Sequence, residues 1–254
     1  MVGTVIAKVA GSALGATYTM PAADGSAGEF LKTDGSTNLS FGAIATTGFS
    51  DVHQATSGSS TYTVPADITK LLVIITGGGG GGASGNSGLG QQGWGGGAAT
   101  TVIARVTVVA ADTITIAIGA GGAAASGGGN DGTIGGDSTF THASGSGSGS
   151  MSTITSPGGK PGRYLAEVVA PAAGTVGANN EGISILGGYG NPSDKEVSGG
   201  ASFWGGGGQG ARQSVMQARV GPAYGSGGGG GSGTSSYDGA AAGADGICFI
   251  IEFK

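Results

Sequence analysis

The chain has 254 residues, of which 61 are glycine and only 10% are charged, and its formal net charge is −5. Glycine occurs in clusters and proline only seven times, which excludes the strict every-third-residue repeat of collagen. The ten basic residues are scattered singly, so nucleic acid and anionic membranes are excluded as partners. One cysteine and two histidines that lie far apart provide neither an internal disulfide nor a plausible zinc set.

Residues 1 to about 47 form a first segment of ordinary glycine content. It contains a near-repeat, ADGSAGEFLK followed by TDGSTNLSFG, in which Asp24-Gly25-Ser26 and Asp34-Gly35-Ser36 recur. Asp-Gly is a strong turn signal, so the repeat predicts short strands separated by tight turns. Two such strands are not stable alone. We expect them to lack a partner inside the chain and to pair with other copies of it, which favours a homotrimer.

From residue 48 to residue 254 the chain alternates between strand-like segments and glycine runs, and this part forms a second predicted domain. The strands are expected at 60–65, 69–76, 100–109, 113–118, 138–142 and 247–253. Residues 69–76 are apolar enough to be covered on both faces, whereas 101–108 alternate with a period of two. The best helical candidate, 211–220, is one short stretch without caps. The fold class is therefore predicted to be all-β.

The glycine runs raise the question of whether they are flexible linkers, as isolated Gly/Ser tracts often are. They occupy residues 77–97, 119–136, 145–149, 158–162, 187–190, 199–210 and 225–233. A strongly apolar strand follows all of them. If the runs were free coil, this strand would have to find its partners in the sheet through about 150 flexible residues, so we expect the runs to be ordered. Ordering glycine costs much backbone entropy and buries no side chain, so backbone hydrogen bonds must compensate. Packed left-handed helices of the polyproline-II type leave every N–H and C=O free for such bonds.

Seven motifs follow one another in a particular order: YTVPADITKLLVIITGGGGGG, GGGAATTVIARVTV, TITIAIGAGG, GGDSTFT, SFWGGGGQG, AYGSGGGGG and DGAAAGADGICFIIEF. Over residues 48–254 this order resembles the glycine-rich domain of bacteriophage tail-fibre and receptor-binding proteins. The resemblance implies a β-sandwich interleaved with packed polyglycine-II helices, and adhesin loops that touch the host surface. The segment MPAADGSAGEFLKTDGSTNLSF is similar to a short repeat of trimeric tail-fibre shafts, which implies a fibre-like N-terminal segment.

The sequence offers little for catalysis. Asp194 and Glu196 are a close acidic pair, but a glycosidase needs two carboxyl groups about 5–10 Å apart across one cleft. Lys160 in GGKPG lacks the Ser/Thr of a phosphate-binding loop. Residues Asp131 and Asp137 lie in a blurred copy of a calcium-binding nonapeptide, and a single copy cannot stack. We expect no enzyme activity, no cofactor and no metal site, with a saccharide depolymerase as the enzymatic alternative.

Binding through loops is the better prospect, since sugars stack on aromatic rings and polar neighbours bond their hydroxyl groups. The candidate receptor contacts are Trp94, Asn180, Tyr189, Lys195, Phe203, Trp204, Arg212, Gln217, Arg219 and Tyr237. Further loop candidates are Gln91, Gln92, Asn179, Glu181, Asn191, Gln213 and Asp238. For the aromatic residues the alternative is that they cover the glycine helices or their junction with the sandwich.

These observations predict a virion protein that acts as a tail-fibre or tail-tip adhesin. Residues 1–47 would attach it to other tail or fibre proteins or trimerise it, and residues 48–254 would bind a host-surface glycan or outer-membrane protein. The alternative is a purely structural virion component, such as a fibre connector or a capsid decoration, without receptor contact. Cys248 on the last strand is expected to be a small buried hydrophobe.

Overall fold

The computed structural model describes residues 21–23, 25–27, 29–33, 35–36, 38–43, 48–144, 152–166, 171–178, 180–191, 197–212, 216–233 and 239–254. The chain divides into two compact units, Met1–Thr47 and Gly48–Lys254. Eleven strands and no helix occur in these described ranges, so the prediction of an all-β protein is confirmed.

The first unit contains a short hairpin. Strand β1 (Glu29–Thr33) pairs antiparallel with β2 (Leu39–Ala43), and the connection contains Gly35 at a φ of +83°. Asp24 and Asp34 of the predicted turns lie outside the described residues. The expectation that these strands lack a partner inside the chain was wrong, because each pairs with the other. A two-stranded hairpin of this size is still marginal by itself.

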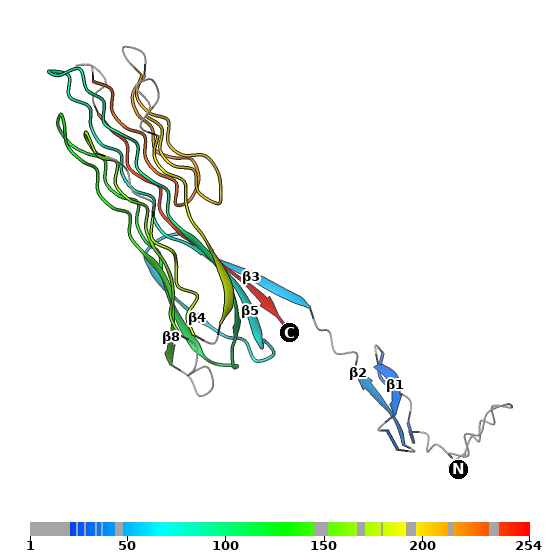
Figure 1. The fold of residues 1–254 in the computed structure, drawn as a ribbon. Helices are drawn as coiled ribbons and strands as arrows, with labels where there is room; N and C mark the ends of the chain where they lie inside the picture. Colours follow the sequence, from blue (N-terminus) through cyan, green and yellow to red (C-terminus); the bar gives the residue numbers. More distant parts are fainter. Residues whose placement is uncertain are drawn as a thin grey trace. The chain divides into compact units, whose positions relative to one another are not determined.

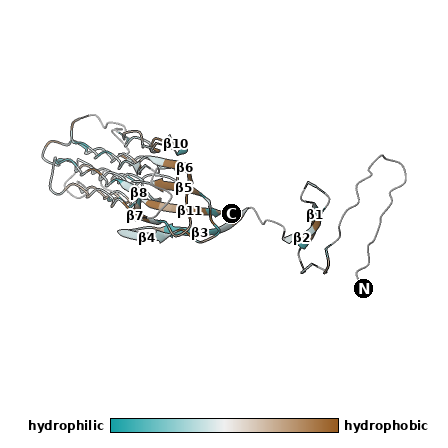
Figure 2. Cartoon of the chain, turned by 90° about the horizontal axis from the view of Figure 1, so that it is seen from below, coloured by the Kyte–Doolittle hydropathy of each residue, from teal (hydrophilic) through white to brown (hydrophobic). Residues whose placement is uncertain are grey.

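Five antiparallel strands form the larger sheet of the second unit, in the order β10-β6-β5-β11-β3. Their bounds are β3 Phe49–Ala55, β5 Lys70–Thr76, β6 Thr101–Thr107, β10 Glu181–Ile185 and β11 Ile247–Phe253. The C-terminal strand β11 lies between β5 and β3 and therefore joins β3 to the rest of the sheet. Figure 2 shows the five strands side by side, with the most apolar residues on β5, β6 and β11.

The smaller sheet has the order β4-β7-β8-β9, again antiparallel. Its strands are β4 Ser59–Thr63, β7 Thr113–Ala117, β8 Ser138–Ser144 and β9 Ile154–Ser156. Alternate side chains of both sheets form one buried core, to which β5 contributes Val73, β6 Val102, β7 Ile114, β8 Phe140 and β9 Ile154. The two sheets therefore form a β-sandwich-like framework.

Strand β11 has two different faces. Cys248 and Ile250 are buried in the core, and Cys248 is a free cysteine, as predicted. Phe249, Ile251 and Phe253 point to the opposite face and are half-buried. The apolar character of this strand therefore serves both faces of the larger sheet.

The glycine segments continue directly from the strands and run side by side, as the undulating traces in Figure 1 show. Along residues 78–84, successive N–H groups donate to three different neighbouring segments, and every third residue returns to the same neighbour. The bonds, written as donor to acceptor residue, are 78 to 136, 81 to 133, 84 to 130, 79 to 244, 82 to 241, 80 to 97 and 83 to 94. Each of these three neighbours runs antiparallel to 78–84.

The carbonyl groups of the same segment repeat the pattern with three parallel neighbours. Residues 78 and 81 accept from 159 and 162, residues 79 and 82 from 122 and 125, and residues 80 and 83 from 228 and 231. The N···O distances of all these bonds lie between 2.7 and 3.0 Å. Within the described chain, residues 78–84 thus bond six neighbours with a period of three residues. We call the assembly of hydrogen-bonded glycine segments the glycine lattice.

The lattice leaves no space for side chains at its centre. A Cβ atom would lie 2.0 Å from the carbonyl oxygen of Ser226 at Gly79, and 1.9 Å from that of Ala123 at Gly81. At Gly206, by contrast, a Cβ atom would meet nothing within 4 Å. This explains why the strongly apolar strand β5 is followed at once by six glycines: its extension enters the centre of the lattice.

Candidate functional site

Three loops with exposed side chains lie at the end of the glycine lattice that is remote from the sandwich. The first loop, residues 86–91, is closed by reciprocal backbone bonds, Asn86 N to Gln91 O at 2.7 Å and Gln91 N to Asn86 O at 3.1 Å. Inside it, the Asn86 side chain accepts from Gly88 N at 3.1 Å, and Gly90 takes a φ of +64°. Leu89 at its apex is 67% exposed. The loop therefore holds an apolar side chain in water.

A second loop, residues 126–131, is fastened to the same lattice segment. Asn130 N donates to Ser84 Oγ at 3.0 Å, and Asn130 Nδ2 donates to Ser126 O at 2.6 Å. Asp131 Oδ1 accepts from the backbone N of Tyr164 at 2.6 Å.

The third loop, residues 164–166, completes the connection. The Tyr164 hydroxyl donates to Gln91 Oε1, and Gly93 forms a β-bridge with Tyr164. Leu165 has a φ of +58° and is 61% exposed. We call residues 86–91, 126–131 and 164–166 the tip loops. Side-chain and backbone bonds join all three.

Two of the predicted contacts lie near the tip loops. Trp94 belongs to the last lattice turn, since its N–H donates to Arg163 O and its carbonyl accepts from Ala83 N; its side chain is half-buried. Arg212 is exposed, follows Ala211 in the chain and forms a β-bridge with Met216. Ala211 N donates to Gly230 O, one residue from the partner of Gly93. The structure thus brings Arg212, Trp94 and the predicted loop residue Gln91 to one end.

Trp204 lies elsewhere, at the junction of lattice and sandwich. Its Nε1 donates to Thr76 Oγ1, the last residue of β5, at 2.8 Å. Its ring lies 5.2 Å from that of Phe249 and 5.0 Å, edge-on, from that of Phe203. This position corresponds to the alternative interpretation of the aromatic residues as a cover over the junction.

The remaining predicted contacts are dispersed. Asn180 Nδ2 donates to Val176 O at 2.8 Å and to Ser152 O at 3.3 Å, next to the start of β10 and far from the tip loops in the chain. Tyr189 is 62% exposed beside the lattice. Gln217 and Arg219 are exposed on a lattice segment whose backbone bonds residues 209 and 229. Lys195 and Tyr237 lie outside the described residues, as do Asn179, Gln213 and Asp238.

The sequence interpretation missed Tyr164, Leu89, Asn86 and Asn130. Three of them share a signal that could have identified them: Asn86 and Asn130 each interrupt a glycine run with a polar residue, and Tyr164 follows the end of one, which is where the lattice turns back. Leu89 stands within one such turn and carries no signal of its own.

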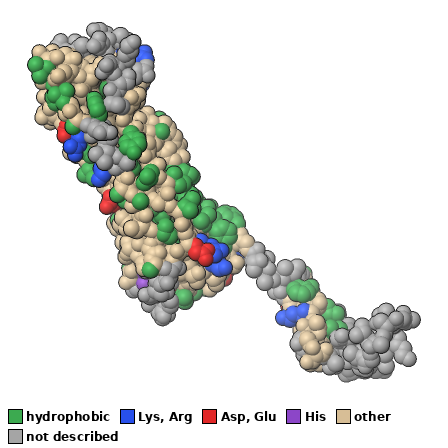
Figure 3. All heavy atoms as spheres, viewed as in Figure 1, with side chains coloured by type: hydrophobic (Ala, Val, Ile, Leu, Met, Phe, Trp, Pro, Cys, Tyr) green, Lys and Arg blue, Asp and Glu red, His purple; other side chains and the backbone are tan. Residues whose placement is uncertain are grey.

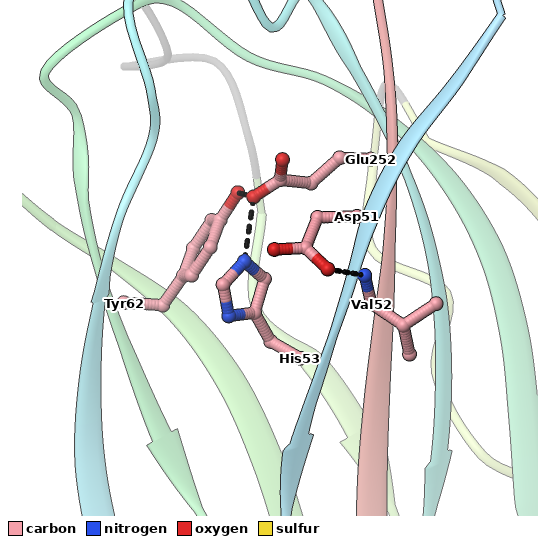
Figure 4. A network of polar contacts seen from close by, with 5 residues as sticks. All are labelled: Asp51, Val52, His53, Tyr62 and Glu252. Carbon is pink, nitrogen blue, oxygen red and sulfur yellow. Dashed lines mark hydrogen bonds and ion pairs between the residues drawn. The ribbon is translucent and has the colours of Figure 1, made fainter.

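A buried carboxylate links the two sheets at the other end of the unit (Figure 4). Glu252 on β11 is 3% exposed, and its Oε1 lies 2.7 Å from His53 Nε2 on β3 and accepts from the Tyr62 hydroxyl on β4 at 2.7 Å. Burial, and then the bond to Glu252, raise the pKa of Tyr62 above its ordinary value. His53 belongs to the larger sheet, because β3 is its edge strand. The network fastens β3 and β4 together.

Charged side chains are few and scattered over the visible face of residues 48–254, without a broad basic region (Figure 3). In the described part of the chain, no three His, Cys, Asp or Glu side chains come together as a metal site. None of the described segments is a helix long and apolar enough to cross a membrane.

Comparison with known proteins adds the family. None of the curated proteins compared with the chain matches it. The sequence model of the family described as a glycine-rich domain matches residues 54–252, which covers both sheets except most of β3 and the last residue of β11, and the whole lattice. The chain therefore belongs to the glycine-rich domain family.

Proposed function

We propose that this protein is a receptor-binding adhesin of a bacteriophage tail fibre or tail tip. In this proposal the sandwich is the base of residues 48–254, the glycine lattice is a stiff spacer, and the tip loops contact the host. The observation that carries it is the tight backbone bonding of residues 78–84 to six neighbours, since this bonding supports loops at a fixed position.

We assign the lattice segments to polyglycine-II helices. Three residues per turn and bonds only to neighbouring segments are the properties of this helix type. The three-residue return of the bonds along 78–84 and the close approach of backbones at Gly79 and Gly81 support the assignment.

The tip loops carry side chains suited to a surface receptor. Leu89 and Leu165 present apolar area, while Gln91 and Tyr164 present polar groups that already bond each other. Arg212 adds a cation at the same end. This mixture fits a glycan or an outer-membrane protein loop of the host, because such partners offer both apolar patches and hydrogen-bonding groups.

The first unit would link the protein to the rest of the virion. The β1–β2 hairpin is too small to be stable alone, and Phe30 and Leu31 are 47% and 42% exposed on it. Other tail or fibre proteins, or two further copies in a homotrimer, would cover this apolar surface. Light scattering on residues 1–254 beside residues 48–254 tests the trimer: a trimer and a monomer, respectively, are expected, and two monomers would refute it.

The adhesin proposal is tested by binding the fluorescent protein to cells of the phage host. The double variant Leu89→Ala with Arg212→Ala is expected to lose at least about tenfold in affinity, which corresponds to about 1.4 kcal/mol. The double variant Ile183→Ala with Lys70→Ala, which removes an exposed aliphatic side chain and an exposed cation from strands of the sandwich, is the matched control and should bind as the parent does. Equal binding of all three, or no binding by the parent, would overturn the proposal.

A structural component without receptor contact is the second candidate. The junction position of Trp204 favours it, because one of the predicted receptor contacts has a packing role instead. Exchange of the tip loops between related phages decides between the two functions. A changed host range supports the adhesin, and an unchanged one supports the structural component.

A further inference from the structure

An open groove lies where the glycine lattice meets the sandwich, and we propose that it is a second binding site, for a neutral pyranose sugar. Its lining comes from the β3–β4 turn and from residues 220–224 and 242–245. The side chains that matter are Thr56, Ser57, Val220, Pro222, Tyr224 and Asp245. The proposal goes beyond the tip loops, to which this groove does not belong.

The groove and the tip loops lie at opposite ends of the lattice. Gly225 N bonds Asp245 O, and Gly79 N bonds Ala244 O, so the groove lies level with the first lattice residues. The tip loops begin after Gly85. Six residues at about 3.1 Å each separate these two levels by roughly 20 Å. One sugar ring cannot reach both.

Tyr224 supplies the aromatic face. It is 39% exposed in a turn that is closed by Ser226 N to Ala223 O at 3.1 Å and by Ser226 Oγ to Ala223 O at 2.6 Å. Gly225 takes a φ of +69° to complete this turn. The ring is thus held in water by a fixed backbone, which suits stacking against the C–H face of a pyranose.

Asp245 supplies a positioned acceptor. Its Oδ1 accepts from Gly121 N at 2.8 Å, which fixes the carboxylate, and within the described chain no hydrogen bond is formed by Oδ2. Thr56 and Ser57 add exposed hydroxyl groups to the lining, beside Gly58 at a φ of +64°. A carboxylate accepts hydrogen bonds from sugar hydroxyls but repels an acidic sugar. The groove therefore favours neutral over acidic saccharides.

Small residues leave space for the ring. Ala223, Ala242, Gly243 and Ala244 also line the groove. Gly243 cannot be enlarged, because a Cβ atom there would lie 2.1 Å from Gly79 O. The shape of this surface is therefore fixed by the lattice itself.

The experiment titrates the full chain with maltohexaose, mannohexaose and hexa-N-acetylchitohexaose as neutral probes and with hexagalacturonate as the acidic one, followed by saturation-transfer NMR. At least one neutral probe is expected to bind in the millimolar range or tighter, and hexagalacturonate at least about tenfold more weakly. Tyr224→Ala and Asp245→Asn are each expected to weaken the neutral probe about tenfold. Tyr224→Phe, which keeps the ring and the turn, should retain most of the binding.

Tyr189→Ala is the matched control, since it removes another exposed tyrosine; it should bind as the parent does. The proposal is overturned if no neutral probe binds, if hexagalacturonate binds as well as they do, or if Tyr224→Ala changes nothing. Failure of the adhesin proposal looks different. In that case the sugar still binds and depends on Tyr224, whereas host cells do not bind or do not depend on Arg212.

Discussion

The sandwich and the glycine lattice of residues 48–254 are both buried, but they are stabilised in opposite ways. In the sandwich, Val73 and Phe140 remove apolar side chains from water, each worth about 1.5–3 kcal/mol. In the lattice, Gly80 and Gly81 have no side chain to bury, and each N–H and C=O bonds a different segment. Each such bond is worth about 1 kcal/mol net. One chain thus combines two kinds of solid interior.

Opposite kinds of substitution should destabilise the two interiors. A packed core is sensitive to removal of atoms, because a cavity remains. The lattice is sensitive to the addition of a single atom. Carbonyl oxygens of neighbouring segments already lie about 2 Å from the position that a Cβ atom would take. Single substitutions in each interior therefore test this contrast.

The largest effect is expected for Phe140→Ala in the sandwich. Phe140 is fully buried on β8, so its loss leaves a cavity and should lower the free energy of unfolding by about 4 kcal/mol. Chemical denaturation measures it. A loss below about 1 kcal/mol would mean that the core is not packed as described.

Gly81→Ala in the lattice should cost about 3 kcal/mol, although it adds only a methyl group. The new Cβ would lie 1.9 Å from Ala123 O, and the neighbouring backbone cannot move without breaking its own bonds. Gly206→Ala is the matched control: with nothing within 4 Å, it should be neutral or stabilise by up to about 1 kcal/mol. Equal melting temperatures for both variants would contradict the lattice.

Tyr62→Phe should cost about 2 kcal/mol near neutral pH, because it removes a hydrogen bond to the buried Glu252 carboxylate. It should also change the response to alkali. The pKa of Tyr62 is raised in the folded protein, so its contribution is complete below the unfolded value of about 10 and is lost as the pH rises beyond it.

Denaturation at about pH 8 and about pH 11 tests this response. The parent should lose more stability between the two than Tyr62→Phe does, and Tyr189→Phe, exposed on the lattice, should behave as the parent. A pH response of Tyr62→Phe as steep as that of the parent would count against the Glu252 network.

The smallest effect is expected for Trp204→Phe, about 1 kcal/mol. The variant loses the bond to Thr76 Oγ1 but keeps an aromatic ring against Phe249. Thermal unfolding measures it. A loss of more than about 3 kcal/mol in the free energy of unfolding would exceed the contribution of one hydrogen bond and would contradict this description of the junction.

Much of the sandwich could be predicted from the sequence, because its strands are apolar or alternate with a period of two. The prediction of 247–253 coincides with β11, and that of 69–76 differs from β5 by one residue. Strands β3, β9 and β10 were missed for physical reasons. FSDVHQA is polar and becomes a strand only because β11 supplies its partner, and β9 is three residues long.

The glycine runs predicted backbone bonding in the lattice but not its register. Which residues meet at the tip depends on that register: Asp131 meets Tyr164, and Tyr164 meets Gln91, although these residues are far apart in the chain. Trp204 shows the same limit, since its position beside Thr76 follows from the path of the chain and not from its glycine neighbours.

Amide hydrogen exchange tests the account most directly, because it reports on each backbone bond. The amides of residues 78–84 are expected to exchange as slowly as those of β5 in the sandwich, since both are buried and hydrogen-bonded. Exchange of 78–84 at the rate of an unstructured glycine peptide, while β5 stays protected, would contradict the lattice and the support it gives to the tip loops.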